Sequence, residues 1–291
     1  MKGAGLLSLL AIAAGLHAAD APPDATETRK LIGAMREAAL AYDSRLPDFI
    51  CTQTTHREVL REPNPVAGVK SSGQRGANVM GLSNTEQGWK PMDSFEEQVT
   101  YFGHKETYKL VSMNGKRAKK DDVPPPGVAS TGEFGSTLGG IFDPRSHADF
   151  QWKRSDKLRG KSVYVFSYSI DKENSASEIT AGTFRLVVGY HGLLFVDRDT
   201  NTTTMMRVTT EAEIPPDFPM QHVTHLLDYG EAVIAGTSYL VPLHSEMESR
   251  VSQDFANYGK VGGTSPLLTF RNKIDFKDYR KYGVESTLKP E

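Results

Sequence analysis

The chain of 291 residues contains a single cysteine and almost no excess of charge of either sign. One cysteine excludes a disulfide framework and every zinc or iron–sulfur site built from several cysteines. The 34 lysine and arginine residues against 36 aspartate and glutamate residues leave a formal charge of -2. Because bulk electrostatic binding to nucleic acid or to an acidic lipid surface needs a basic excess, the composition argues against both kinds of partner.

Sequence motifs of catalysis and cofactor binding are also missing. The chain has no HExxH pair, no Gly-x-Ser-x-Gly elbow and no phosphate loop, since the glycine-rich run 132–140 lacks the Gly-Lys-Ser/Thr ending. His222 and His225 lie three residues apart in a run that resembles a strand, where such neighbours face opposite ways and cannot readily share a metal. We therefore expect no cofactor, no metal and no enzymatic activity. A hydrolase whose nucleophile and base meet only in the fold stays open.

The first 19 residues have the pattern of a secretory signal peptide. Lys2 precedes an apolar run from Leu6 to Leu16, and the small residues Ala18 and Ala19 follow it. The run is too short to span about 30 Å of hydrocarbon. No cysteine follows it directly, so we expect no lipid anchor. The sequence predicts a signal peptide at 1–19 and a mature chain, 20–291, that is periplasmic or secreted and does not span a membrane.

Cys51 would then be a lone thiol in an oxidising compartment. One interpretation is a reactive or intermolecularly paired thiol. The favoured one is a small buried hydrophobe in the strand-like run Phe49–Thr52, because no histidine or lysine in that run would lower its pKa.

Helical periodicity is limited to two places. A helix is expected over 25–45, capped by Asp24 with Glu27 three residues later, and its apolar stripe comprises Ile32, Met35, Ala39 and Tyr42. A second, short helix is expected near 131–142, with Phe134, Leu138, Ile141 and Phe142 on one stripe and a capping box at 130–133.

Alternating strand patterns fill most of the remaining chain. Eleven strands are expected, at 49–60, 95–102, 107–113, 149–157, 162–170, 183–190, 192–197, 205–213, 222–229, 238–250 and 267–279. Strands without alternating helices favour a mainly β fold in a single domain: one large curled antiparallel sheet, an unclosed β-barrel, with the N-terminal helix and the short helix on its concave side. In the strand 162–170, Val163 and Val165 lie on one face, and the other face is equally apolar. Both faces of this strand should therefore be covered at its start. The polar stretch 62–91 is expected to be a mobile insertion.

Apolar side chains on these strands and on the short helix form the candidate ligand site. The concave face of a curled sheet is large for two helices to fill, which favours an apolar hollow. A filled core is the equal alternative. The candidate ligand-binding residues are Phe95, Val99, Tyr101, Phe134, Leu138, Tyr164, Phe166, Tyr168, Phe195, Tyr239 and Val241.

Two hairpin motifs resemble the periplasmic lipoprotein-carrier fold of LolA, LolB and the N-terminal domain of RseB. The first is Gly192–Thr200 followed by Met206–Val208, and the second is Leu227–Tyr229 followed by Val233–Pro242. Runs 131–135 and 141–144 are similar to a group of exported bacterial proteins to which no activity is assigned. The resemblance implies an unclosed barrel, capped by helices, whose apolar cavity receives lipoprotein acyl chains. It carries over no functional residue.

These observations predict an exported, non-enzymatic binding protein that holds an apolar ligand, a lipid or a lipidated protein, in the hollow of its sheet. The expected partners are lipid or lipoprotein acyl chains and other envelope proteins. The alternative is a protein-interaction or sensor module of the envelope with a filled core.

Overall fold

The computed structural model describes residues 22–61, 88–124, 133–199, 204–259 and 266–283. The expected signal peptide 1–19, the capping box at 130–132 and most of the insertion 62–91 lie outside these residues. The described end of that insertion is already ordered, because strand β2 begins at Lys90 rather than at the expected Phe95.

The N-terminal helix forms as expected, but it is divided in two. Helix α1 (Ala25–Leu40) is capped by Asp24, whose Oδ1 accepts from the amides of Thr26 and Glu27 at 2.7 and 2.8 Å. The helical segment reaches Arg45 as expected, but a turn at Ala41 divides it, and it resumes as α2 (Tyr42–Arg45). The buried stripe begins at Leu31 rather than Ile32, which is only half-buried.

Eleven strands form one open antiparallel sheet, which confirms the predicted fold class. Their order is β4-β3-β2-β1-β13-β12-β11-β10-β9-β6-β5, so the last strand lies between the first strand and β12. The strands are β1 (Phe49–Arg61), β2 (Lys90–Phe102), β3 (Lys105–Met113), β4 (Lys116–Arg117), β5 (Asp149–Leu158), β6 (Lys161–Ile170), β9 (Tyr190–Asp197), β10 (Met205–Ala212), β11 (Met220–Ile234), β12 (Thr237–Ser252) and β13 (Leu267–Lys281).

The strand expected at 183–190 does not join this sheet. Its residues form β8 (Phe184–Val187), which pairs only with β7 (Glu178–Ala181) in a separate hairpin. Gly182, with a φ of +60°, makes the turn between them. Alternation marked these residues correctly as a strand but could not identify their partner.

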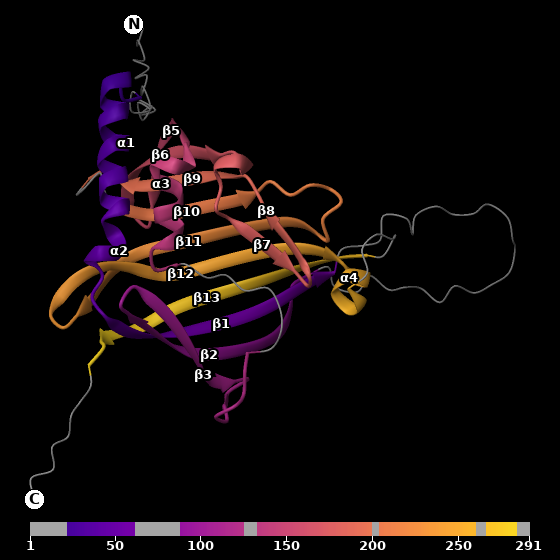
Figure 1. Cartoon of the computed structure of the whole chain (residues 1–291). Helices are drawn as coiled ribbons and strands as arrows, with labels where there is room; N and C mark the ends of the chain where they lie inside the picture. Colours follow the sequence, from indigo (N-terminus) through magenta and orange to yellow (C-terminus); the bar gives the residue numbers. More distant parts are fainter. Residues whose placement is uncertain (1–21, 62–87, 125–132, 200–203, 260–265, 284–291) are drawn as a thin grey trace, which may run out of the picture.

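The sheet has an apolar inner face and a more polar outer face. On the inner face, Phe166, Leu194, Val208 and Leu227 lie opposite one another on four neighbouring strands, whereas the alternate residues point outward. Helices α1, α2 and α3 (Ser136–Phe142) cover one end of the inner face, and the β7–β8 hairpin with α4 (Gln253–Tyr258) packs at the other end (Figure 1).

Strand β6 is covered on both faces at its start, as the sequence predicted. Val163 and Val165 are fully buried on the outer face with Met206, while Phe166 belongs to the main core on the inner face. Among the described residues, no helix is long and apolar enough to cross a membrane.

Candidate functional site

The structure brings most of the predicted ligand-binding side chains together on the inner face. Seven are buried in the main core, and two more pack against it. The seven are Val99, Tyr101, Phe134, Leu138, Phe166, Tyr168 and Val241, and the two are Tyr164 and Tyr239.

The other two predicted residues lie elsewhere. Phe195 points to the outer face, because it alternates with Leu194 and Val196 along β9, and it packs with the Val163 cluster. Its assignment to the inner set is therefore wrong, since the strand periodicity places it on the opposite side. Phe95 keeps the inner-face parity of Val99 but lies outside the main core, with the guanidinium of Arg57 5.7 Å from its ring centroid.

Side chains of the covering helices fill the space above these strands. Phe49 stacks on Tyr101 with ring centroids 5.1 Å apart, and Phe134, just before α3, lies 5.2 Å from Phe49. Phe142 of α3 stacks on Phe150 of β5 at 5.1 Å, and Met35 of α1 is 1% exposed. In the part of the chain that the structure describes, these nine residues thus lie in or against one core that also contains side chains of α1, α2 and α3.

Two tyrosine hydroxyls lie within this apolar interior without a hydrogen-bond partner. Tyr42 of α2 and Tyr229 of β11 contact each other edge to face, with centroids 5.9 Å apart. Burial raises the pKa of both phenols well above the usual value. A buried hydroxyl that makes no hydrogen bond costs about 1–3 kcal/mol of stability, so the packing between α2 and the sheet is polar where an apolar contact would be more stable.

A polar group lies on the inner face beside the main core. His225 Nε2 is 2.8 Å from Ser245 Oγ on the neighbouring strand and 3.9 Å from Glu133 Oε1, just before α3. Burial lowers the pKa of His225 to about 4. Serine and carboxylate approach the same ring nitrogen, and Ser245 is fully buried, so the geometry differs from a triad in which the carboxylate orients the other nitrogen. These side chains connect β11, β12 and the segment leading to α3.

Cys51 belongs to the main core, as the favoured interpretation predicted. It is fully buried and free, and burial raises its pKa to about 12. The thiol therefore stays protonated at neutral pH, in which form it is a poor nucleophile.

The two neighbouring histidines point to opposite faces, as expected for a strand. His225 meets Ser245 inside, whereas His222 Nδ1 lies 3.8 Å from Glu211 on the outer face. Within the described ranges, no group of three or more histidine, cysteine or acidic side chains is arranged to hold a metal ion.

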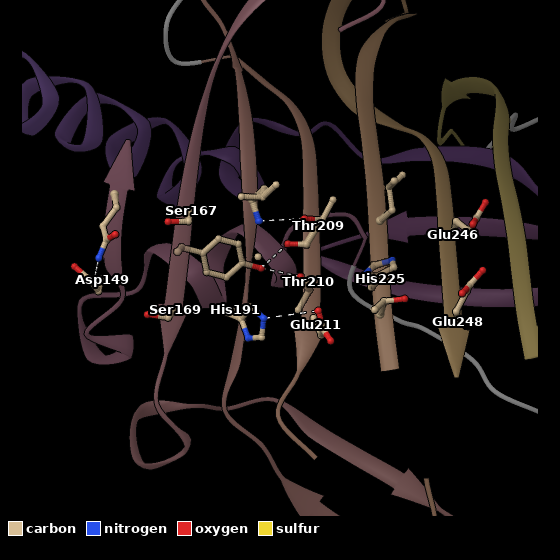
Figure 2. A pocket seen from close by; sticks show the side chains of 16 residues that line it. Asp149, Ser167, Ser169, His191, Thr209, Thr210, Glu211, His225, Glu246 and Glu248 are labelled. Atoms are coloured by element: carbon tan, nitrogen blue, oxygen red, sulfur yellow. Dashed lines mark hydrogen bonds and ion pairs between the residues drawn. The ribbon is translucent and has the colours of Figure 1, made fainter. Parts of the chain in front are cut away.

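The outer face carries a trough of about 650 Å³ that the sequence analysis missed (Figure 2). Two adjacent rows of side chains line it across six strands. The first row is Gln151, Ser167, Leu193, Thr209, Leu226 and Glu246, and the second is Asp149, Ser169, His191, Glu211, Thr224 and Glu248.

Alternation does indicate that these residues face away from the core. It does not indicate which of them lie opposite one another, because that depends on the pairing register of six strands. The bulges at Trp152/Arg154, Met205/Arg207 and Asp228/Tyr229 help to set this register. The trough could therefore be found only from the structure.

No family model matches this chain, and no curated protein matches it either. Three solved structures are similar to it. A LolA superfamily protein from Nitrosomonas europaea is 11% identical, with a TM-score of 0.37, over 89% of this chain and 97% of that chain. A DUF1329 family protein from Desulfovibrio piger is 12% identical, with a TM-score of 0.37, over 89% and 95%.

The third is a domain described as an outer membrane lipoprotein-sorting protein, from Vibrio parahaemolyticus. It is 11% identical, with a TM-score of 0.33, over 89% of this chain and 92% of that chain. Two of the three are named for the lipoprotein-carrier group that the hairpin motifs resemble. At these values the likeness concerns the fold alone.

Proposed function

We propose that this protein is an exported, non-enzymatic binding protein that holds an apolar ligand, a lipid or the acyl chain of a lipidated protein, against the inner face of its sheet. The ligand takes the place of helix α1. One observation supports this above all: the cover of a continuous apolar face includes helix α1, which only three buried side chains hold in place.

Helix α1 buries little for its length. Of its 16 residues, only Leu31, Met35 and Ala39 are buried. At about 1.5–3 kcal/mol for each large side chain and about 0.8 kcal/mol for a methyl group, their burial contributes roughly 4–7 kcal/mol. Conformational entropy lost by the ordered helix offsets part of that.

An acyl chain offers more apolar surface than α1 does. Each buried methylene contributes about 0.8 kcal/mol, so a chain with 14 of them contributes about 11 kcal/mol before ordering costs. The ligand would contact the candidate ligand-binding residues of the inner face. Among them are Val99, Phe166, Tyr168 and Val241. Phe195, on the other face, is excluded from this set.

A pair of matched serine substitutions on α1 tests this proposal. Leu31→Ser weakens the contact of the helix with the core. Leu40→Ser is the control, because it makes the same substitution on the same helix at a side chain that is 46% exposed. Loosening the cover raises the fraction of molecules competent to bind. A fluorescent fatty acid should therefore bind Leu31→Ser about five- to tenfold more tightly than the wild type, and Leu40→Ser unchanged.

The assay is a titration followed by probe fluorescence, with circular dichroism to show that both variants are folded. Native mass spectrometry of protein exported into a bacterial periplasm then reports whether lipid copurifies. Equal probe affinity of Leu31→Ser and the wild type would contradict displacement of α1.

The second candidate function is a protein-interaction module with a filled core. It is favoured by the packing of nine candidate residues in or against one core that also contains buried side chains of α1, α2 and α3. Under this function neither the wild type nor Leu31→Ser binds the fatty acid at any concentration, and the exported protein carries no lipid.

A further inference from the structure

The trough on the outer face has a composition unlike that of the inner face. Its first row is mostly neutral, with Leu193 and Leu226 between hydroxyl and amide side chains, and its second row carries carboxylates. Figure 2 shows both rows crossing the strands, with the covering helix behind them. The trough and the apolar core thus lie on opposite sides of the same strands.

Carboxylates recur along the second row at intervals of three and then two strands. Asp149 lies on β5, Glu211 on β10 and Glu248 on β12, with Glu246 beside Glu248 in the first row. Neighbouring strands are about 4.8 Å apart, so three strand steps separate Asp149 from Glu211 by roughly 14 Å and two steps separate Glu211 from Glu248 by roughly 10 Å. The row therefore presents negative charge over about 24 Å.

Arg271 and His191, two basic side chains near this row, are engaged with acidic groups. Arg271, one strand beyond Glu248, lies 3.5 Å from it but is held 2.6 Å from Glu58 and stacks on Trp89 at 3.8 Å. The lining contains two histidines: His191, which lies 3.7 Å from Glu211, and His225, whose ring meets Ser245 on the inner face. Carboxylates thus outnumber bases among the lining residues.

We propose that the trough binds an extended, basic segment of a partner protein. Consecutive residues of an extended peptide are roughly 3.3 Å apart, so about eight of them span 24 Å, and their side chains alternate between its two sides. Lysines that all face the trough therefore lie an even number of residues apart. Two spacings of four residues, about 13 Å each, match the interval of 14 Å and overshoot the last carboxylate by only about 2 Å, which a flexible lysine stem can cover. Their aliphatic stems lie along Leu193 and Leu226 while their ammonium groups meet the carboxylates.

The lining argues against a sugar or a short amine as the occupant. Tyr168 is the one tyrosine in the lining, and its side chain belongs to the inner face, so the trough offers no aromatic platform for a sugar ring. A short linear amine spans only part of the row and meets only two of the three carboxylate positions.

A charge-neutralising triple variant tests the proposal. Asp149→Asn, Glu211→Gln and Glu248→Gln remove the carboxylates and keep the side-chain shapes. The matched control carries Asp156→Asn, Glu178→Gln and Glu231→Gln, which change the net charge equally at exposed positions outside the lining. Thermal unfolding confirms that both proteins are folded.

The probe is a fluorescein-labelled peptide with three lysines, each separated from the next by three glycine or serine residues, so that all three face the same side of the extended chain. Fluorescence anisotropy is measured at 20 and at 200 mM salt. The trough variant should bind at least tenfold more weakly than the control, with a weaker salt dependence. An isomeric peptide with three adjacent lysines should bind more weakly to the wild type.

Three results would overturn the proposal. The first is no binding of the spaced peptide to the wild type at low salt, and the second is equal affinity of the trough variant and its control. The third is equal affinity for spaced and adjacent lysines, or displacement of the peptide by spermidine at equal charge concentration, which would assign the trough to amines in general. None of these results bears on the inner face or on the proposed lipid ligand.

Discussion

Acidification from pH 7 to pH 5 should destabilise the protein through His225, because the folded state holds this imidazole neutral. Its side chain is 17% exposed, and burial lowers its pKa to about 4 from the ordinary value of 6.5. The unfolded chain takes up a proton near pH 6.5, whereas the folded protein does so only near pH 4. Between these values the unfolded state binds more protons, so the free energy of unfolding falls as the pH falls.

The magnitude follows from the two pKa values. The contribution of His225 is complete above pH 6.5, and linkage gives a loss of about 2 kcal/mol at pH 5 and about 3 kcal/mol at pH 4. That is a large share of the 5–15 kcal/mol typical of a folded domain.

Urea unfolding at pH 7, 6 and 5, followed by the fluorescence of Trp89 and Trp152, measures this loss. His225→Gln is the control, since a glutamine amide can still bond to Ser245 Oγ but takes up no proton. Glu133, 3.9 Å from the imidazole, is the acidic group that faces it. Glu97, whose pKa burial raises, is present in both proteins, so its contribution cancels in the comparison. If wild type and variant lose the same stability between pH 7 and 5, the imidazole is not held neutral and the reasoning is wrong.

Two further pairs of substitutions test the packing. A Cβ on Gly192 would lie 1.8 Å from the carbonyl oxygen of Thr209, so Gly192→Ala should cost about 3 kcal/mol or more in urea unfolding. Gly33→Ala, on helix α1 with nothing within 4 Å, should instead stabilise by about 0.5–1 kcal/mol, and a loss there would contradict an open helical position. Tyr229→Phe removes an unpaired buried hydroxyl and should leave the free energy of unfolding unchanged or raise it by about 1 kcal/mol. Tyr168→Phe removes bonds to Thr209 and Thr210 and should lower it by about 1–2 kcal/mol, so the opposite order of the two tyrosine variants would refute the hydrogen-bond assignment.

Local patterns were sufficient to predict the elements that depend on neighbouring residues. Asp24 could be predicted as the cap of helix α1 because it stands directly before the helical pattern. The burial of Met35 and Ala39 could be predicted because these residues recur with the helical period. Alternation predicted the burial of Val163 and Val165 on one face of β6. Each of these features is set within about ten residues of chain.

Features that depend on distant partners could not be predicted in this way. The pairing of β8 with β7 alone and the insertion of β13 between β1 and β12 are choices among strands of similar composition. The edge-to-face contact between Tyr42 and Tyr229 likewise joins residues far apart in the chain. Whether the inner face is hollow or filled depends on how closely α3 approaches it, which no spacing reveals.

The inner face and the trough can be tested separately, because neighbouring residues of the same strands point to opposite sides of the sheet. On β10, Val208 faces the core and its neighbour Thr209 faces the trough, and on β9 the same holds for Leu194 and Leu193. A substitution at a trough carboxylate therefore changes charge on one side and leaves the apolar face intact. Conversely, Leu31→Ser acts on the far side of the sheet from Glu211. A variant at either surface that altered both the fatty-acid and the peptide titrations would show that the strands transmit strain between the faces, because each substituted side chain lies on one side of the sheet alone.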